Sequence, residues 1–110
     1  MISQEELEQI EISNKEALIA VEKGEALKRL LDSDDYKLVF TEGYLNEYAS
    51  NLGKAIARNT GQYDVDKLME NLKGINTFIG YTFAVSNAYH EASQTLRDNE
   101  AYIAQSEDQE

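Results

Sequence analysis

The sequence predicts an all-α fold: an antiparallel bundle of about three helices, with a short N-terminal helix and a long C-terminal helix. The 110-residue chain contains no proline, its six glycines stand singly among helix-favouring residues, and its apolar residues recur at spacings of three and four. This length is that of one domain. We therefore expect a single helical domain over residues 1–104, followed by an acidic flexible tail at 105–110.

Two capping boxes mark helix starts near the N-terminus. Ser3 is followed three residues later by Glu6, and Ser13 by Glu16, so that each pair can satisfy backbone N–H groups reciprocally. We expect a short helix over about residues 4–11 and a longer one over 14–32. The longer helix carries an apolar stripe with one basic exception: Ala17, Ala20, Val21, Gly24, Leu27, Lys28 and Leu31.

A run of good capping residues, Asp32 to Asp35, predicts the start of the next helix. This helix should span 34–58 and end near Asn59–Thr60–Gly61, where glycine or asparagine can adopt the left-handed conformation. Five residues form its expected core seam: Leu38, Leu45, Ala49, Leu52 and Ile56.

Asp64 is placed to cap a third helix over 65–99. Its inward candidates are Leu68, Leu72, Ile75, Ile79, Phe83, Ala92 and Leu96. A helix of this length measures about 52 Å, whereas a compact domain of this size is about 35 Å across. Either the helix kinks around Gly80, or the molecule is elongated, or the surplus end packs against another chain.

Aromatic residues form two clusters on the predicted helices. Tyr36, Phe40, Tyr44 and Tyr48 recur every four residues and sweep a face separate from the leucine seam. Polar side chains fall among them, so this face is not wholly buried. The second cluster is Phe78, Tyr81, Val85 and Tyr89. Tyrosine suits protein interfaces, since it combines a large contact area with a polar tip. The alternative interpretation is that both clusters are ordinary core between neighbouring helices.

The charge of −11 is concentrated at the two ends of the sequence. Residues 1–12 carry four glutamates and no base, and residues 91–110 carry six acids against Arg97, so residues 13–90 sum to only −2. Nucleic-acid binding and anionic membrane surfaces need clustered Lys and Arg, and the ten bases here are scattered. We therefore expect neither direct nucleic-acid binding nor membrane binding. The longest apolar run, Ala17–Val21, is far below the roughly 20 residues of a membrane span, and we expect no export signal.

Catalytic and metal-binding signatures do not occur at the spacings their chemistry requires. The chain has no cysteine, and its single histidine, His90, lacks the partner of a helical zinc or di-iron site. The aspartates around Ser33 begin like a calcium loop, but Lys37 and Gly43 stand where glycine and glutamate are required. No phosphate-binding loop is present. We therefore expect no catalytic residue, metal or cofactor, and hence no enzyme. A metalloenzyme that binds its metal through carboxylates is kept as an alternative, after the two functions given below.

The segment from Ala26 to Leu52 contains four short motifs in a fixed order: Ala26–Leu30 (ALKRL), Asp35–Lys37 (DYK), Glu42–Tyr44 (EGY), and Glu47 with Ala49. In this order the segment resembles a family of small acidic helical proteins of tailed bacteriophages. The family has no assigned reaction, so the resemblance implies a phage origin and supplies no catalytic or ligand residues. Since we expect no export signal, the location expected for such a phage protein is the host cytoplasm, with the virion as the alternative.

Taken together, these features predict a non-enzymatic phage interaction protein, oligomeric or docked on a protein partner. Its expected interface is Tyr36, Phe40, Tyr44, Tyr48, Phe78, Tyr81, Val85 and Tyr89. A virion or head-assembly accessory role would fit. The alternative is an acidic inhibitor that mimics nucleic acid and occupies a basic groove of a host nucleic-acid-binding or defence protein.

Overall fold

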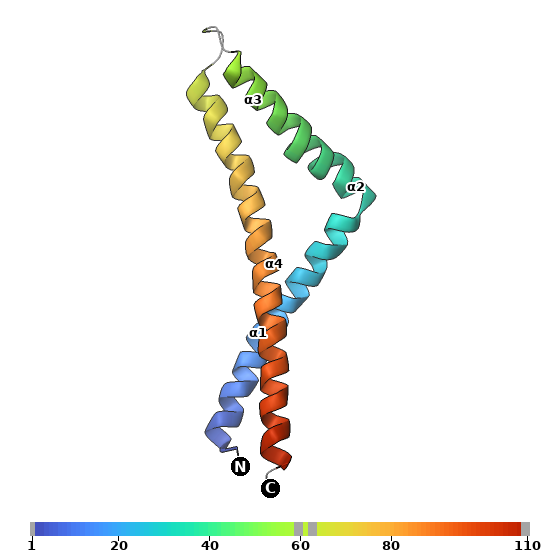
Figure 1. Cartoon of the computed structure of the whole chain (residues 1–110), viewed down its shortest axis with the longest axis vertical. Coiled ribbons are helices and arrows are strands. Elements are labelled where there is room, and N and C mark those ends of the chain that lie inside the picture. Colours follow the sequence, from blue (N-terminus) through green and yellow to red (C-terminus); the bar gives the residue numbers. More distant parts are fainter. Residues whose placement is uncertain (1, 59–60, 62–63, 109–110) are drawn as a thin grey trace. The chain divides into compact units, whose positions relative to one another are not determined.

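The computed structural model describes residues 2–58, 61 and 64–108, and this part of the chain is all-α without strands. Helix α1 spans Gln4–Asp32. Three segments then follow one another directly: α2 (Asp34–Tyr36), η1 (Lys37–Tyr48) and α3 (Ala49–Ala57). Helix α4 spans Val65–Asp108 (Figure 1). The predicted all-α class is confirmed.

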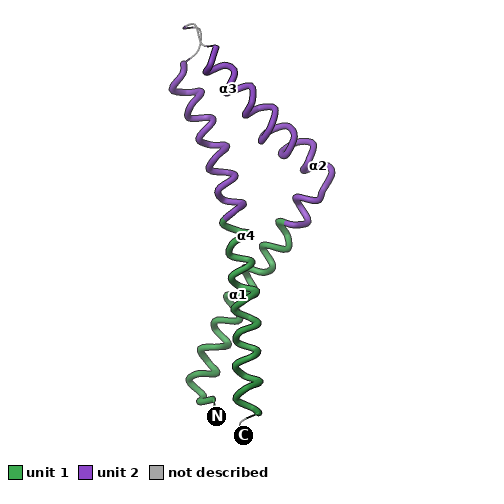
Figure 2. The backbone as a smooth tube through the Cα atoms, viewed as in Figure 1, with its two compact units in different colours: residues 1–27, 84–110 green, residues 28–83 purple. Residues whose placement is uncertain are grey.

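The chain falls into two compact units, shown in different colours in Figure 2. Unit 1 comprises residues 1–27 and 84–110, and therefore joins most of α1 to the C-terminal part of α4. Unit 2 comprises residues 28–83 and joins the end of α1, α2, η1, α3 and the first part of α4.

One N-terminal helix replaces the two that the capping boxes predicted. Ser3 caps α1 as expected, since its Oγ accepts the N–H of Glu6 at 3.1 Å. The prediction of a break before Asn14 is wrong: α1 continues through it. Ser13 Oγ and Asn14 Oδ1 instead accept hydrogen bonds from Asn99 Nδ2, at 3.3 and 2.8 Å. Because the turn before Ser13 is already helical, the Ser13 and Asn14 side chains are not needed as a cap and can hydrogen-bond α4 instead.

The ends of the second helical stretch were predicted correctly. Ser33 Oγ accepts the N–H of Tyr36 at 3.3 Å, and α3 ends at Ala57. Gly61 has a φ of +91°, the left-handed conformation expected after this helix. Asp64 Oδ1 accepts the N–H of Lys67 at 3.3 Å and caps α4. The expected contribution of Asn59 and Thr60 lies outside the described residues.

Helix α4 extends beyond its predicted end. It is continuous through Gly80 and reaches Asp108, so residues 105–108, expected to begin a flexible tail, are helical. Glycine and proline are absent after Gly80, and nothing in this sequence stops the helix earlier. Residues 109–110 lie outside the described part of the chain.

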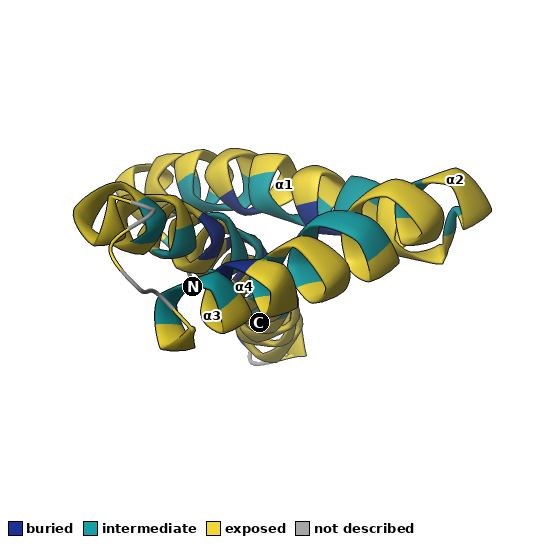
Figure 3. Ribbon diagram, turned by 90° about the horizontal axis from the view of Figure 1, so that it is seen from above, coloured by how far each residue is buried: buried dark blue, intermediate teal, exposed yellow. Residues whose placement is uncertain are grey.

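Few side chains in the described ranges are buried (Figure 3). The buried hydrophobic residues are Ala17, Leu52, Ile75, Val85 and Ala92, and Gly24 is buried with them. Two expected core residues are exposed: Leu38 retains 65% of its accessible surface and Phe83 63%. Their assignment to the core was wrong, because helical periodicity identifies an apolar face without showing whether a partner covers it.

Unit 1 is held by a close antiparallel approach of two helices. A methyl group placed on Gly24 of α1 would overlap Cβ, Cγ and Cδ2 of Tyr89 on α4. Asn99 and Tyr102 of α4 reach the earlier part of α1, where Asn99 bonds Ser13 and Asn14 and the Tyr102 hydroxyl donates to Glu6 Oε2 at 3.3 Å. As α4 runs from Tyr89 to Tyr102, its contacts on α1 move back from Gly24 to Glu6, so the two helices are antiparallel.

Candidate interaction surface

Five aromatic side chains of unit 2 form one cluster, termed the aromatic ladder: Tyr36, Phe40, Tyr44, Tyr48 and Phe78. Neighbouring rings along α2 and η1 lie 5.0, 6.4 and 5.8 Å apart between centroids. Phe78 of α4 stacks on Phe40 at 6.0 Å and meets Tyr44 edge-on at 5.7 Å. These are favourable aromatic geometries.

The winding of η1 explains why the ladder faces α4. Segment η1 is a π-helix with i→i+5 hydrogen bonds, so each residue turns by about 82° instead of about 100°. With that winding, the four ladder residues of α2 and η1 lie within about 60° of the direction of Leu52, and Leu38 lies about 140° away from it. The two separate apolar faces expected for a regular α-helix thus merge into one, and Leu38 turns to solvent.

The ladder is only partly covered. Phe40 and Tyr48 keep 39% and 43% of their surface exposed, while Tyr36, Tyr44 and Phe78 are half-buried. These rings are therefore partly packed within unit 2 and partly open to solvent.

The remaining expected interface residues are not part of the ladder. Tyr81 belongs to unit 2 and is 61% exposed. Val85 and Tyr89 belong to unit 1, where Val85 is buried and Tyr89 packs on Gly24. The structure thus brings five of the eight residues together and places the last two in a different unit.

Large hydrophobic side chains that are exposed are concentrated in unit 2. Of the fourteen large hydrophobic residues exposed in the described ranges, ten lie in unit 2 and four in unit 1. The ten are Leu30, Leu31, Leu38, Val39, Phe40, Tyr48, Val65, Met69, Tyr81 and Phe83. Periodicity had assigned Leu38 and Phe83 to the core, and the sequence pattern had not singled out Val39 or Met69.

The net charge divides in the opposite way. Unit 1 holds 13 acidic and three basic residues, a net charge of −10 with His90 neutral, and unit 2 holds eight acidic and seven basic residues, a net charge of −1. The fold of unit 1 also brings the two acidic ends of the chain together, since Glu6 meets Tyr102. Most of the exposed large hydrophobic side chains therefore lie in unit 2, and most of the net negative charge lies in unit 1.

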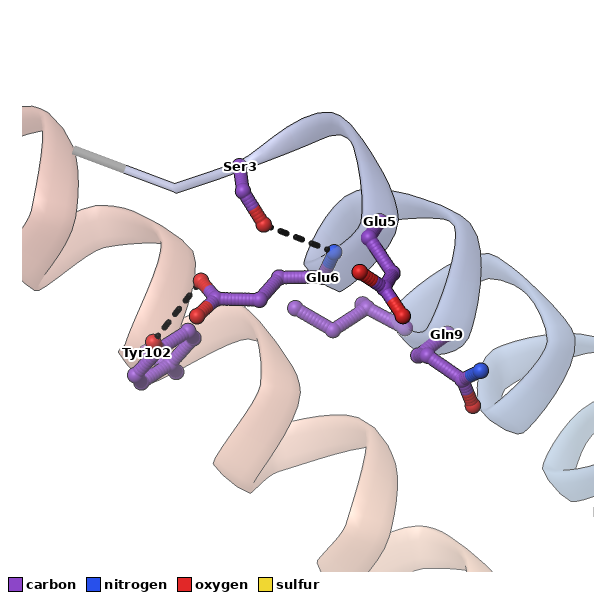
Figure 4. A pocket seen from close by; sticks show the side chains of 6 residues that line it. Ser3, Glu5, Glu6, Gln9 and Tyr102 are labelled. Atoms are coloured by element: carbon purple, nitrogen blue, oxygen red, sulfur yellow. Dashed lines mark hydrogen bonds between the residues drawn. The ribbon is translucent and has the colours of Figure 1, made fainter.

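The acidic end of unit 1 contains an open groove of about 440 Å³. Ser3, Glu5, Glu6, Gln9, Ile10 and Tyr102 line it (Figure 4). The negative charge of Glu6 and its hydrogen bond raise the pKa of the Tyr102 hydroxyl above its ordinary value of 10.0. The raised pKa keeps the Tyr102 hydroxyl protonated at neutral pH, so it acts there as a hydrogen-bond donor to Glu6.

Within the described residues, no three His, Cys, Asp or Glu side chains are grouped so that they could hold a metal ion. No helix in the same ranges is long and apolar enough to cross a bilayer. Comparison of the chain with protein-family models, with curated proteins and with solved structures gives no match.

Proposed function

We propose that this chain is a non-enzymatic bacteriophage protein that acts by binding protein, as an oligomer or on a partner, in a virion or head-assembly accessory role. One observation carries the proposal: unit 2 is nearly neutral and exposes ten large hydrophobic side chains. Exposed apolar surface rimmed by polar residues is typical of protein interfaces. The phage origin comes from the resemblance of residues 26–52.

The aromatic ladder supports the same function. Exposed parts of Phe40 and Tyr48 are fixed by stacking on their neighbours, so little conformational entropy is lost when a partner covers them. Rigid aromatic anchors are characteristic of residues that dominate binding energy. We also propose that the expected antiparallel bundle forms only on binding. A helix of the partner, packed on unit 2, would then complete the core of the bundle.

Substitutions of equally exposed residues in the two units test the proposal. Tyr81→Lys changes a residue of unit 2 that is 61% exposed, and Ile19→Lys changes one of unit 1 that is 60% exposed. The full-length tagged chain is expected to retain a phage structural protein from infected cells. Tyr81→Lys combined with Val39→Lys should abolish retention, while Ile19→Lys should retain the same protein. Equal retention by all variants would refute binding through unit 2.

A second function is favoured by the charge of unit 1. Inhibition by nucleic-acid mimicry requires acids on ordered structure, and Glu5, Glu8 and Glu11 lie on α1 while Asp98 and Glu100 lie on α4 of the same unit. Such a surface would speed association with a basic groove.

Neutralising the glutamates separates the two functions. Glu5→Gln, Glu8→Gln and Glu11→Gln together leave the apolar residues of unit 2 intact. Mimicry predicts that binding to a basic host protein is lost and that wild-type binding weakens steeply with salt. Binding through unit 2 predicts that partner retention is unchanged.

A further inference from the structure

One edge of α4 within unit 2 combines exposure with a lack of charge. At about 100° per residue, six positions fall within about 80° of one another: Val65, Met69, Leu72, Asn76, Gly80 and Phe83, termed the α4 edge. Their centre lies about 100° from Ile75, which is only 2% exposed. None of the six is charged.

The α4 edge is open to solvent along its length. Val65, Met69 and Phe83 keep 37%, 40% and 63% of their surface exposed, Asn76 is exposed, and only Leu72 is half-buried. A methyl group built on Gly80 would have no heavy atom within 4 Å. The side of α4 that bears Ile75 is packed within unit 2, so the α4 edge can receive a further helix beside it.

The order of residues on the α4 edge is complementary to itself. Met69 and Phe83 each lie seven residues from Asn76, and Leu72 and Gly80 each lie four residues from it. In an antiparallel pair centred on Asn76, Met69 of one copy would meet Phe83 of the other, and Leu72 would meet the open surface at Gly80. Thioether–aromatic contact and large-to-small packing are both favourable. The two Asn76 amides can donate and accept across the axis.

We propose that the α4 edge binds a second copy of this chain, antiparallel and with the two-fold axis at Asn76. The inference rests on the proposed function in that it names the partner of unit 2. A two-fold interface presents the same patch from both copies, and residues 69–83 of the α4 edge match one another in this way about Asn76. It also fixes orientation, since a parallel pair would oppose Met69 to Met69 and Phe83 to Phe83.

Electrostatics favour a second copy at unit 2. Unit 2 carries −1, so two copies of a −11 chain can meet there with little repulsion, whereas contact through unit 1 would oppose −10 to −10.

The size of the interface sets the expected strength. The part of the α4 edge that pairs with itself, residues 69–83, spans 14 residue steps, about 21 Å, and covers about 230 Å² per copy against about 800 Å² per partner in stable complexes. We therefore expect a reversible dimer whose population rises with protein concentration, not an obligate one.

Sedimentation equilibrium of the full chain over a wide concentration range tests the dimer. The average mass should rise from one chain toward two. Phe83→Lys should keep the mass at one chain, whereas Met69→Glu with Phe83→Lys should restore dimerisation, because the carboxylate introduced at position 69 would face the ammonium group introduced at position 83 of the other copy. Met69→Lys with Phe83→Lys is the matched control and should stay monomeric. Circular dichroism verifies that each variant remains helical.

Cysteine cross-linking tests the axis. The chain has no cysteine, so Asn76→Cys introduces a single thiol at the two-fold axis, and oxidation should join two chains. Glu70→Cys is the control, since Glu70 is exposed on the same helix about 120° away. It should cross-link far more slowly.

The outcomes separate the two proposals. A mass of one chain at every concentration, or equal cross-linking of both cysteine variants, would overturn the dimer. If the chain is monomeric but Tyr81→Lys with Val39→Lys still abolishes partner retention, the proposed function stands without it. If the dimer forms and those substitutions change nothing, binding of another protein through unit 2 is refuted and self-association remains.

Discussion

Gly24 is the position where one added methyl group tests the packing of unit 1 most directly. An alanine Cβ at this position would overlap Cβ, Cγ and Cδ2 of Tyr89. A change of the Tyr89 χ1 angle would relieve the overlap with Cγ and Cδ2 but not with Cβ, which is fixed to the backbone of α4. The two helices must therefore separate, or the contact must be lost.

The magnitude follows from two opposing terms. Glycine to alanine within a helix stabilises by about 1 kcal/mol through backbone entropy and propensity. Overpacking a close contact costs about 1–3 kcal/mol, and the fixed Cβ places this site near the upper value. We expect Gly24→Ala to destabilise the protein by about 1–2 kcal/mol.

Gly53→Ala is the matched control, because a methyl group at Gly53 would have no heavy atom within 4 Å. It should stabilise the protein by about 1 kcal/mol. The difference between the two variants, about 2–3 kcal/mol, then isolates the overpacking cost. Urea unfolding followed by far-ultraviolet circular dichroism measures both. Equal stabilisation by the two substitutions would refute the close approach of Gly24 and Tyr89.

Three further predictions concern single contacts. Glu6→Gln should lower the pKa of Tyr102 toward its ordinary value, and an NMR titration that resolves the tyrosines can follow this change. Because the pKa of Tyr102 is raised in the folded state, its contact with Glu6 contributes stability below pH 10. This stability is lost as the pH rises through the folded-state pKa. Phe78→Ala should cost about 2 kcal/mol by removing the α4 side of the aromatic ladder, while Phe83→Ala, at an exposed position, should change the stability of dilute protein by less than about 0.5 kcal/mol. Ser33→Ala removes the cap of α2 and should cost about 1 kcal/mol in urea unfolding; an unchanged midpoint would contradict that role.

Local signals were sufficient to predict most helix ends. Ser3, Ser33 and Asp64 each accept the backbone N–H three residues ahead, as their positions indicated, and Gly61 adopts the expected left-handed conformation. These interactions are made within one turn, so the sequence around them suffices. Ser13 carried the same signal but lies inside α1, because its hydroxyl serves Asn99, 86 residues later.

The candidate surface was predicted only in part. Tyr36, Phe40, Tyr44, Tyr48 and Phe78 come together as one cluster, although regular α-helical spacing placed the first four on a face of their own. The π-helical winding of η1 turns them toward α4, and no residue pattern in that segment indicated it. The heptad spacing of Met69, Asn76 and Phe83 was visible in the sequence, but it could not show that this edge of α4 remains uncovered.

The sequence by itself determined that the chain is helical, where most helices begin and end, and that its negative charge is gathered at the two ends. These properties depend on residue types and on neighbours within a few positions. Only the tertiary structure decided that the acidic ends share unit 1, that unit 2 holds most of the exposed apolar surface, and that Leu38 and Phe83 face solvent. Burial depends on which distant segment covers a face, and helical periodicity is the same whether that face is covered or open.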